Sequence, residues 1–340
     1  MNPAPHCSRT PMPQQRRSCL LTAIAGAMAV CLWASPAAAQ AYPTKTITLV
    51  VGFPPGGALD TIGRALADEM GKTLGQKVIV DNKPGAGGAL AVNAVLGAPA
   101  DGHTLLMAAI NLATAPAMSG VRYNPRTDLA MVSQITSVPV LMLASGKGTL
   151  KSPAELLALA KKTEGGAKVG TGGIGTSGHL ALELLSRSQK VPLLHVPYKG
   201  GAAASMGLIA GEIDVYYDLG SGSLKSFLDA GTIRALAVMQ DTRSPALPDV
   251  KSAKELGLPA DTYIRSWQGI AVKGGTPQAV VDRLHKAVIA AAESTAFKAR
   301  AWQLASDVVT SKTPADFQRF HDAELDRWTQ VIKDAGIKPQ

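Results

Sequence analysis

The chain has 340 residues, of which 34 are basic and 25 acidic, and its formal net charge is +9. The charges are scattered without a run of five or six of one sign, which excludes the basic patch typical of nucleic-acid-binding proteins. The three cysteines, Cys7, Cys19 and Cys31, all lie near the amino terminus, so the rest of the chain has no thiol for a disulfide, a nucleophile or a metal site.

Residues 1–41 have the pattern of a signal peptide. Arginines precede an apolar stretch over 19–33, and small residues fit cleavage near Ala39 or Ala41. The stretch is shorter than the roughly 20 residues needed to cross a bilayer. The Arg16-Arg17 pair leaves both ordinary secretion and twin-arginine export open. The segment contains three arginines and no acid. We therefore expect a soluble periplasmic protein with 31 basic and 25 acidic residues, long enough for two domains.

A glycine turn follows a predicted strand at 47–51 and opens a helix. Pro54-Pro55 removes two backbone donors, whereas Gly56-Gly57 exposes the backbone to a ligand. A helix amino terminus carries unpaired N–H groups and about half a positive charge, so the turn predicts a site for a carboxylate or phosphate. We expect Gly57 to need either a positive φ or bare backbone at the ligand.

Strands and helices alternate along the rest of the chain. The first series comprises a strand at 77–80, a glycine turn at 85–88, a helix at 89–96 and a strand at 103–109. The second comprises helices at 153–161 and 178–188 and strands at 168–171, 193–196, 213–217 and 233–238. A proline-rich, irregular segment at 243–250 precedes a strand at 267–272 and helices at 278–292 and 314–335. The alternation predicts an α/β protein with mostly parallel sheets.

The final helices are too few for a third domain, and we expect them to pack back on the first. The chain would then cross twice between two α/β lobes, which makes a cleft with a hinge. We place lobe 1 at 42–142 with 262–340, and lobe 2 at 143–261.

A second glycine turn, at 172–178, repeats the order of strand, glycines and helix. Two such helix ends facing one cleft could hold one anion, or the two ends of a diacid. Thr176 and Ser177 bring hydroxyl groups to this turn, where they could contact a ligand or cap the helix.

Residues 173–178 also match G-x-G-x-x-G, which leaves an exported dinucleotide-dependent oxidoreductase as the alternative. Such a site needs an acid about 20 residues on, but the next strand ends in His195-Val-Pro-Tyr-Lys199. The turn is one residue short of a G-x-S-x-G hydrolase elbow. The five histidines after residue 41 lack metal-ligand spacing. We therefore expect no catalytic residue, no cofactor and no metal.

Two aspartates lie at positions where a ligand could reach them. Asp60 falls in the first turn of the first helix, where the helix dipole favours a negative charge without any function. Asp218 ends a predicted strand and could hold a ligand amine or a water, or accept backbone bonds as a turn residue.

These motifs together resemble the Bug-type, TctC-like periplasmic solute-binding proteins of the tripartite tricarboxylate transporter family. In chain order, the similarity rests on Tyr42-Pro43, Phe53-Pro-Pro-Gly-Gly57 with Asp60, Asn82-Lys-Pro-Gly-Ala-Gly-Gly88, Asp101-Gly-His-Thr-Leu-Leu106, Gly175-Thr-Ser177 with His179-Leu180, His195-Val-Pro-Tyr-Lys-Gly200, residues 243–250 and Gly275-Thr-Pro277. The segments cover nearly the whole chain after residue 41.

The resemblance implies a type II periplasmic-binding-protein fold, in which two lobes close on a small carboxylate without catalysis. It implies that backbone amides and waters of the 53–60 turn meet the carboxylate from one lobe. The residues expected to bind the ligand are Phe53, Pro55, Gly56, Gly57, Asp60, Gly87, Gly88, Gly175, Thr176, Ser177, Tyr198 and Asp218.

The implied ligand is a di- or tricarboxylate, an amino-acid-like acid or an aromatic acid. The implied partners are TctA- and TctB-like integral-membrane subunits or a sensor kinase, and the receptor is expected to be a monomer. Ala89 and Leu219 stand where polar residues are common in the family. We therefore expect a more apolar far end of the pocket, which favours a simple or aromatic carboxylate over an aspartate-like one.

Overall fold

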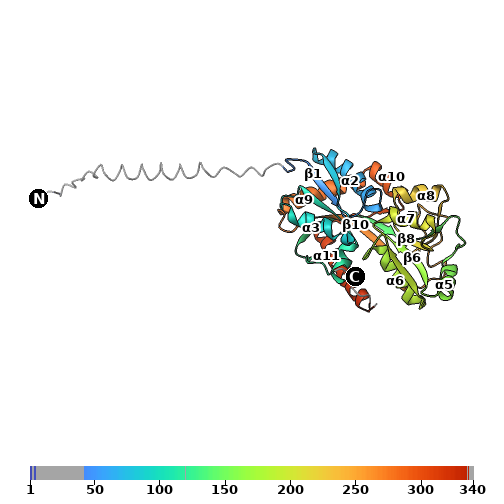
Figure 1. Cartoon of the computed structure of the whole chain (residues 1–340). Coiled ribbons are helices and arrows are strands. Elements are labelled where there is room, and N and C mark those ends of the chain that lie inside the picture. The colour runs from blue at the N-terminus through green and yellow to red at the C-terminus, as the bar shows by residue number, and fades with distance from the viewer. Residues whose placement is uncertain (2–3, 5–41, 119, 335, 337–340) are drawn as a thin grey trace. The chain divides into compact units, whose positions relative to one another are not determined.

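Figure 1 shows the computed structural model of the chain, which describes residues 1, 4, 42–118, 120–334 and 336. The described residues from Lys45 onward form one compact unit. The expected signal peptide and its cleavage site lie outside the described residues, apart from Met1 and Ala4. Within the described ranges, no helix is long and apolar enough to cross a membrane.

A six-stranded sheet is built from both ends of this unit. Its strands are β1 (Ile47–Val51), β2 (Val78–Asn82), β3 (Thr104–Ala109), β4 (Leu129–Pro139), β10 (Arg265–Lys273) and β11 (Asp307–Val308). Their order is β11-β4-β10-β3-β1-β2. β1 pairs in parallel with β2 and β3, whereas β10 pairs antiparallel with β3 and β4. The short apolar run of β1 is almost wholly buried, as expected for a central parallel strand.

A five-stranded sheet is built from the middle of the chain. Its strands are β5 (Leu141–Ser145), β6 (Ala167–Thr171), β7 (Leu193–Pro197), β8 (Val215–Asp218) and β9 (Ile233–Val238). Their order is β7-β6-β8-β5-β9. β6 pairs in parallel with β7 and β8, whereas β5 pairs antiparallel with β8 and β9.

The two sheets confirm the expected pair of α/β lobes, and we call the part with the six-stranded sheet lobe 1 and the other lobe 2. The expectation of mostly parallel sheets was wrong. Crossover connections make successive strands of one lobe parallel, but β5 enters lobe 2 directly from β4. β10 likewise returns to lobe 1 from lobe 2. β5 inserts antiparallel beside β8, and β10 inserts antiparallel beside β3. β8 and β3 are each the third parallel strand of their sheet.

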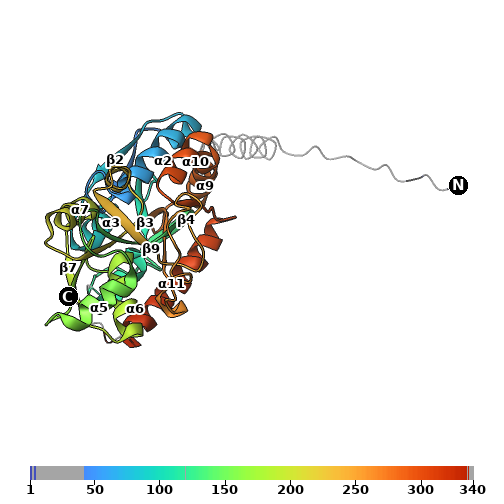
Figure 2. The ribbon, with the colours of Figure 1, turned by 90° about the vertical axis from the view of Figure 1, so that its right-hand side faces the viewer.

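Ten α-helices within the described residues complete the lobes. In lobe 1 they are α2 (Ala58–Leu74), α3 (Ala89–Gly97), α4 (Asn111–Met118), α9 (Gln278–Glu293), α10 (Thr295–Gln303) and α11 (Pro314–Asp334). In lobe 2 they are α5 (Pro153–Lys162), α6 (Ser177–Gln189), α7 (Gly201–Ala210) and α8 (Gly222–Asp229). Figure 2 shows α2, α9 and α10 side by side, and α11 contacts α4 and β4. The carboxyl-terminal helices therefore cover lobe 1.

The longest of these helices anchors β10, one of the strands that reaches the interlobe region. Trp267 on β10 and Trp328 on α11 are both buried. Their indole N–H groups donate to Glu324 Oε2, at 3.2 Å and 2.9 Å respectively. A buried carboxylate with two such donors fixes the helix against the strand.

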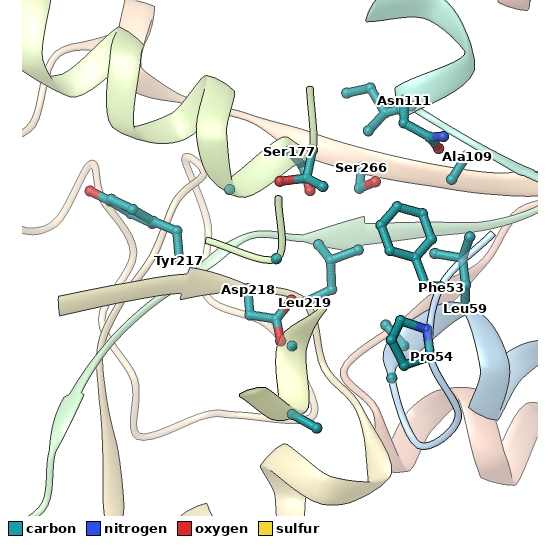
Figure 3. A pocket seen from close by; sticks show the side chains of 18 of the residues that line it. Phe53, Pro54, Leu59, Ala109, Asn111, Ser177, Tyr217, Asp218, Leu219 and Ser266 are labelled. Atoms are coloured by element: carbon teal, nitrogen blue, oxygen red, sulfur yellow. The ribbon is translucent and has the colours of Figure 1, made fainter. Parts of the chain in front are cut away.

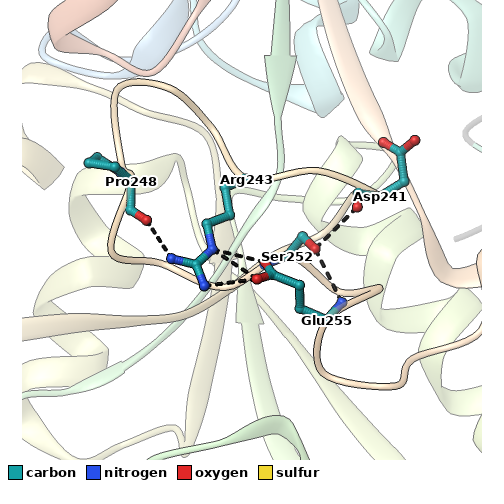
Figure 4. A network of polar contacts seen from close by, with 5 residues as sticks. All are labelled: Asp241, Arg243, Pro248, Ser252 and Glu255. Atoms are coloured by element: carbon teal, nitrogen blue, oxygen red, sulfur yellow. Dashed lines mark hydrogen bonds and ion pairs between the residues drawn. The ribbon is translucent and has the colours of Figure 1, made fainter.

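An ion pair holds the proline-rich segment between β9 and β10 (Figure 4). Arg243 Nη2 donates to Glu255 Oε1 at 2.8 Å, and its Nη1 donates to Pro248 O at 2.7 Å. Ser252 Oγ donates to Asp241 O at 3.2 Å. The hydrogen bonds from Arg243 lower the pKa of the Glu255 carboxyl to about 2. The segment is therefore irregular in outline but fixed by side chains.

Candidate ligand-binding site

A pocket lies between the two lobes, with about 660 Å³ of empty space that includes a part open to solvent. Lobe 1 contributes Phe53, Pro54, Pro55, Gly57, Ala58, Leu59, Ala109, Ile110, Asn111 and Ser266. Lobe 2 contributes Gly172, Thr176, Ser177, Gly178, Gly201, Ala202, Tyr217, Asp218 and Leu219. Figure 3 shows the Phe53 ring on one side of this space and Ser177 and Asp218 on the other.

The first helix amino terminus at the pocket belongs to α2. Gly57 precedes the helix with φ −73° and ψ 174°, and no described side chain caps it. Ala58 and Leu59 also line the pocket, so the first N–H groups of α2 are available to a ligand oxygen. The positive φ that was one expectation for Gly57 lies instead at Gly56, at 82°. Bare backbone at the ligand is the remaining reason for a glycine at 57.

Asp60 lies behind this turn and holds it together. Its buried carboxylate accepts hydrogen bonds from Gly56 N at 2.8 Å, Asn82 Nδ2 at 2.9 Å and Arg64 Nε at 3.1 Å. Asn82 Nδ2 also donates to Phe53 O at 2.9 Å. Burial raises the pKa of Asp60, but these hydrogen bonds outweigh it and hold the pKa below its ordinary value. Asp60 therefore shapes the turn without lining the pocket.

The second helix amino terminus belongs to α6, in lobe 2. Thr176 caps the helix, because its Oγ1 accepts from His179 N at 3.5 Å, and it also donates to Gly173 O at 2.7 Å. Ser177 is 3% exposed, and its side chain has no hydrogen-bond partner among the described residues. A Cβ added at Gly178 would lie 2.5 Å from Tyr217 O. The glycine thus lets the helix end rest directly on β8.

The third helix amino terminus belongs to α7. Gly200 precedes it with φ 97°, and no side chain in the described part of the chain caps the helix. Gly201 and Ala202 line the pocket. A Cβ at Gly200 would lie 2.9 Å from Pro54 Cδ, so the two lobes meet closely here. Sequence reasoning missed this helix end, although Gly200-Gly201 after a strand is the same signal as in the other two turns.

Asp218 ends β8 at the edge of the pocket. A Cβ at Gly201 would lie 2.5 Å from Asp218 Oδ2 and 2.8 Å from the Tyr216 hydroxyl oxygen. The carboxylate and the hydroxyl therefore both lie against the first residue of α7. Burial raises the pKa of Asp218 to about 6, although the Tyr216 hydroxyl and the Leu219 N–H favour the charged form.

A buried hydroxyl on the lobe 1 side completes the polar groups. Ser266 on β10 lines the pocket, and its Oγ is buried without a hydrogen-bond partner in the described structure. Buried polar groups normally have partners, so the free hydroxyl of Ser266 points to a polar occupant. Among the described residues, the pocket lining contains no lysine, arginine or histidine. Backbone dipoles and hydroxyls, not basic side chains, are therefore what an anion would meet.

Half of the twelve residues expected to bind the ligand line the pocket: Phe53, Pro55, Gly57, Thr176, Ser177 and Asp218. Gly56 and Asp60 form the turn behind it. Gly87 O accepts from Asn111 Nδ2 at 2.8 Å, and a Cβ at Gly88 would lie 2.5 Å from the same atom. These two glycines thus position Asn111, which lines the pocket itself.

The remaining two expected residues lie away from the pocket. Gly175 O accepts from Thr114 Oγ1 at 2.7 Å across the lobes. Tyr198 packs against α7 instead, because a Cβ at Gly207 would lie 2.2 Å from its hydroxyl, which donates to Glu212 Oε2 at 2.9 Å. Another hydrogen bond between the lobes runs from Ser223 Oγ to Gly56 O, at 3.2 Å. The lobes therefore touch through hydrogen bonds around the pocket.

The histidine nearest the pocket packs behind the α6 turn. His179 stacks on His195 with ring centroids 3.9 Å apart, and its Nδ1 accepts from Gly175 N at 3.2 Å. Burial, with a smaller effect of His179, lowers the pKa of His195 to about 3. Across the described residues, no group of three or more His, Cys, Asp or Glu side chains could hold a metal ion.

Asn111 and Ser266 are lining residues that sequence reasoning missed. Asn111 begins α4, a helix that was not expected because its small, apolar residues show no helical stripe. Ser266 lies in β10, and only the return of that strand from lobe 2 brings it to the pocket. No local pattern marks either position.

Comparison with known proteins places the chain among receptors. The model of the family described as "Tripartite tricarboxylate transporter family receptor" matches residues 62–337. Protein BugT of Bordetella pertussis is 31% identical over 309 residues, which cover 90% of this chain and 94% of BugT.

Three solved structures resemble the fold closely. The periplasmic binding protein BugD has a TM-score of 0.82 and 31% identity, over 88% of this chain and 100% of BugD. MatC from Rhodopseudomonas palustris with bound malate has a TM-score of 0.79 and 31% identity, over 86% of this chain and 100% of MatC. The R. palustris protein Rpa4515 with adipate has a TM-score of 0.82 and 31% identity, over 88% and 100%. The likeness extends over both lobes.

Proposed function

The chain belongs to the receptor family of the tripartite tricarboxylate transporters, and from this premise we propose that it is a periplasmic receptor for a small carboxylate. The ligand would bind in the pocket between the lobes. The observation that carries the proposal is the convergence of three helix amino termini and the unpartnered hydroxyl of Ser266 on that pocket. Each helix end favours a negative charge. An anion held this way needs no basic side chain.

The similar structures support a carboxylate over a phosphate. MatC is described with bound malate and Rpa4515 with adipate, which are both dicarboxylates. The walls formed by Phe53, Leu59 and Leu219 favour an acid with an apolar body, of the simple or aromatic kind. We propose Phe53, Pro55, Gly57, Thr176, Ser177 and Asp218 as contact residues, together with Ser266.

The remaining parts of the proposal concern export and partners. We propose that residues 1–41 are removed as a signal peptide, and that the receptor acts as a monomer without catalysis. It would pass its ligand to TctA- and TctB-like membrane subunits or to a sensor kinase.

We place the first crossing of the chain between the lobes at Val140, because β5 begins at Leu141. This is two residues before the expected boundary.

A thermal-shift screen of the mature protein tests the proposed ligand class. The panel contains mono-, di- and tricarboxylates and aromatic acids, with malate and adipate included. A ligand present at 100 times its dissociation constant adds about 2.7 kcal/mol of stability. If none of these acids raises the melting temperature, the proposed function is wrong.

Matched variants then test the proposed site with the best acid from the screen. Ser177→Ala and Ser266→Ala each remove a hydrogen bond to a charged group, about 1.5–3 kcal/mol, so the dissociation constant should rise about tenfold to a hundredfold. Gly57→Val should also prevent binding while the protein stays folded, because a Cβ there meets only Pro54 O, at 3.5 Å. The control is Ser226→Ala, an exposed serine outside the pocket, which should bind normally.

A further inference from the structure

Asp218 is the acidic side chain at a pocket otherwise suited to anions, and it limits what the second end of a ligand can be. We infer that the receptor selects carboxylates whose other end donates a hydrogen bond to Asp218. Such an end is an ammonium, a hydroxyl, an amide or an un-ionised carboxyl group. A dianionic dicarboxylate would then bind only together with one proton. The inference rests on the proposed function and names the ligand class more narrowly.

Two observations place the Asp218 carboxylate at the pocket. Asp218 and Gly201 both line the pocket, and Oδ2 lies so close to Gly201 that a Cβ there would come within 2.5 Å. The Tyr216 hydroxyl lies beside the same glycine. The end of α6, with Ser177, lies on the same side of the pocket as Asp218, and the end of α2 lies on the opposite side with Phe53. The pocket thus combines helix ends that favour an anion with the acidic side chain of Asp218.

The surroundings of β8 offer no cationic side chain to neutralise a second negative charge, and the amino terminus of α7 already lies against Asp218 itself. The elements packed against β8 are β5, β6, α6 and α7. β5 and α7 contain no ionisable side chain, β6 contains Lys168, and α6 contains His179, Glu183 and Arg187. Among the described residues none of these four lines the pocket, and Lys168 is exposed. On the lobe 1 side, Arg64 is already paired with Asp60.

Two carboxylates that share a site without a cation do not both ionise, and one of them keeps a proton. Burial already raises the pKa of Asp218 to about 6 before any ligand arrives. A ligand carboxylate beside it would raise that value further. A donor group on the ligand would instead form a charge-assisted hydrogen bond with the ionised Asp218. The same side chain therefore accepts a zwitterion or an amide directly, and a dianion only with proton uptake.

The test uses four probes on one carbon skeleton with the mature protein. They are butanoate, succinate, succinamate and 4-aminobutanoate, or the matched set of the chain length that the thermal-shift screen favours. Isothermal titration calorimetry measures affinity between about pH 7 and pH 8. In the unmodified protein, the affinity for succinate should fall about tenfold per pH unit, as linkage requires for one proton. The affinities for succinamate and 4-aminobutanoate should change little.

Proton uptake is measured directly by repeating the titrations in buffers of different ionisation enthalpy. About one proton should be taken up per succinate by the unmodified protein, and none by Asp218→Asn. Asp218→Asn should also bind succinate at least tenfold more tightly at about pH 8, and lose affinity for 4-aminobutanoate. Its circular dichroism and melting temperature check that the variant folds.

A second variant keeps the carboxylate and changes only its neighbour. Tyr216→Phe removes a hydroxyl that favours the charged form of Asp218, so proton-linked binding of succinate should extend to higher pH. Succinate binding that is independent of pH in the unmodified protein, or equally dependent on pH in Asp218→Asn, would overturn the inference and leave the proposed function standing. If no carboxylate binds at all, the proposed function fails and the inference with it.

Discussion

Replacing Gly178 by alanine tests whether the end of α6 must rest on β8 for the pocket to work. A Cβ at Gly178 would lie 2.5 Å from Tyr217 O, 3.2 Å from its carbonyl carbon and 3.3 Å from its Cβ. These atoms cannot retreat easily, because β8 is paired on one side with β5 and on the other with β6. The first turn of α6 must therefore move by about 1 Å to reach ordinary contact.

The expected losses of stability and of ligand affinity follow from that displacement. Overpacking of this kind destabilises a protein by about 1–3 kcal/mol, and replacing a helical glycine by alanine returns about 0.5–1 kcal/mol. We expect a net loss of about 1–2 kcal/mol in the free energy of unfolding. A shift of about 1 Å also breaks a hydrogen bond from the helix end to a bound carboxylate, so the affinity should fall at least tenfold.

Urea denaturation measures the stability change, and calorimetry with the best acid from the screen measures the affinity. The matched control is Gly97→Ala, at the exposed end of α3, where an added Cβ meets nothing within 4 Å. The control should keep the affinity of the unmodified protein, and its free energy of unfolding should stay the same or rise by up to about 1 kcal/mol, the gain from alanine in a helix. If Gly178→Ala behaves like this control in both measurements, the close contact between α6 and β8 does not position the ligand.

Two further predictions concern the groups that hold the pocket's parts in place. Thr114→Val removes the hydrogen bond to Gly175 O between the lobes, whereas Thr114→Ser retains it. The valine variant should release ligand about tenfold faster in stopped-flow experiments, since 1.4 kcal/mol corresponds to tenfold, and equal rates in both variants would contradict this. Asp60→Asn should reduce the free energy of unfolding at neutral pH by about 1–2 kcal/mol, because Arg64 and Gly56 lose their charged acceptor. The melting temperature of the variant should fall accordingly. The pKa of Asp60 is held below its ordinary value, so its contribution is present above about pH 4 and lost as pH falls through the folded pKa. The difference in melting temperature between the variant and the unmodified protein should therefore shrink below about pH 4, and a constant difference would refute the assignment.

The features that the sequence predicts well are those written in local patterns. The β1 segment is a short apolar run, which predicts a buried strand. The glycine turns at Gly56-Gly57 and 172–178 predict helix ends next to strands. All of them were found in the expected places. The sequence pattern did not predict α4 and α7, because their many small residues lack the apolar stripe that marks an amphipathic helix.

The features that escape sequence reasoning depend on contacts between distant segments. The antiparallel insertion of β5 and β10 follows from the chain crossing between lobes, which no local spacing records. Ser266 reaches the pocket only through that insertion. Tyr198 shows the reverse case, because a motif residue next to a predicted turn forms a hydrogen bond with Glu212 outside the pocket. Motif membership therefore identified the turns that border the pocket more reliably than the individual side chains that line it.

The division of the anion-binding groups between the lobes bears on how such a receptor would release its ligand. A buried arginine paired with a carboxylate would keep much of its attraction within one lobe, and separating such a pair leaves a costly unpaired charge. Here the end of α2 belongs to lobe 1, whereas the ends of α6 and α7 belong to lobe 2. Neither lobe alone holds the complete set of donors. Movement of the lobes apart would therefore weaken the site in one step, without leaving a buried charge behind, and would couple release to the hinge.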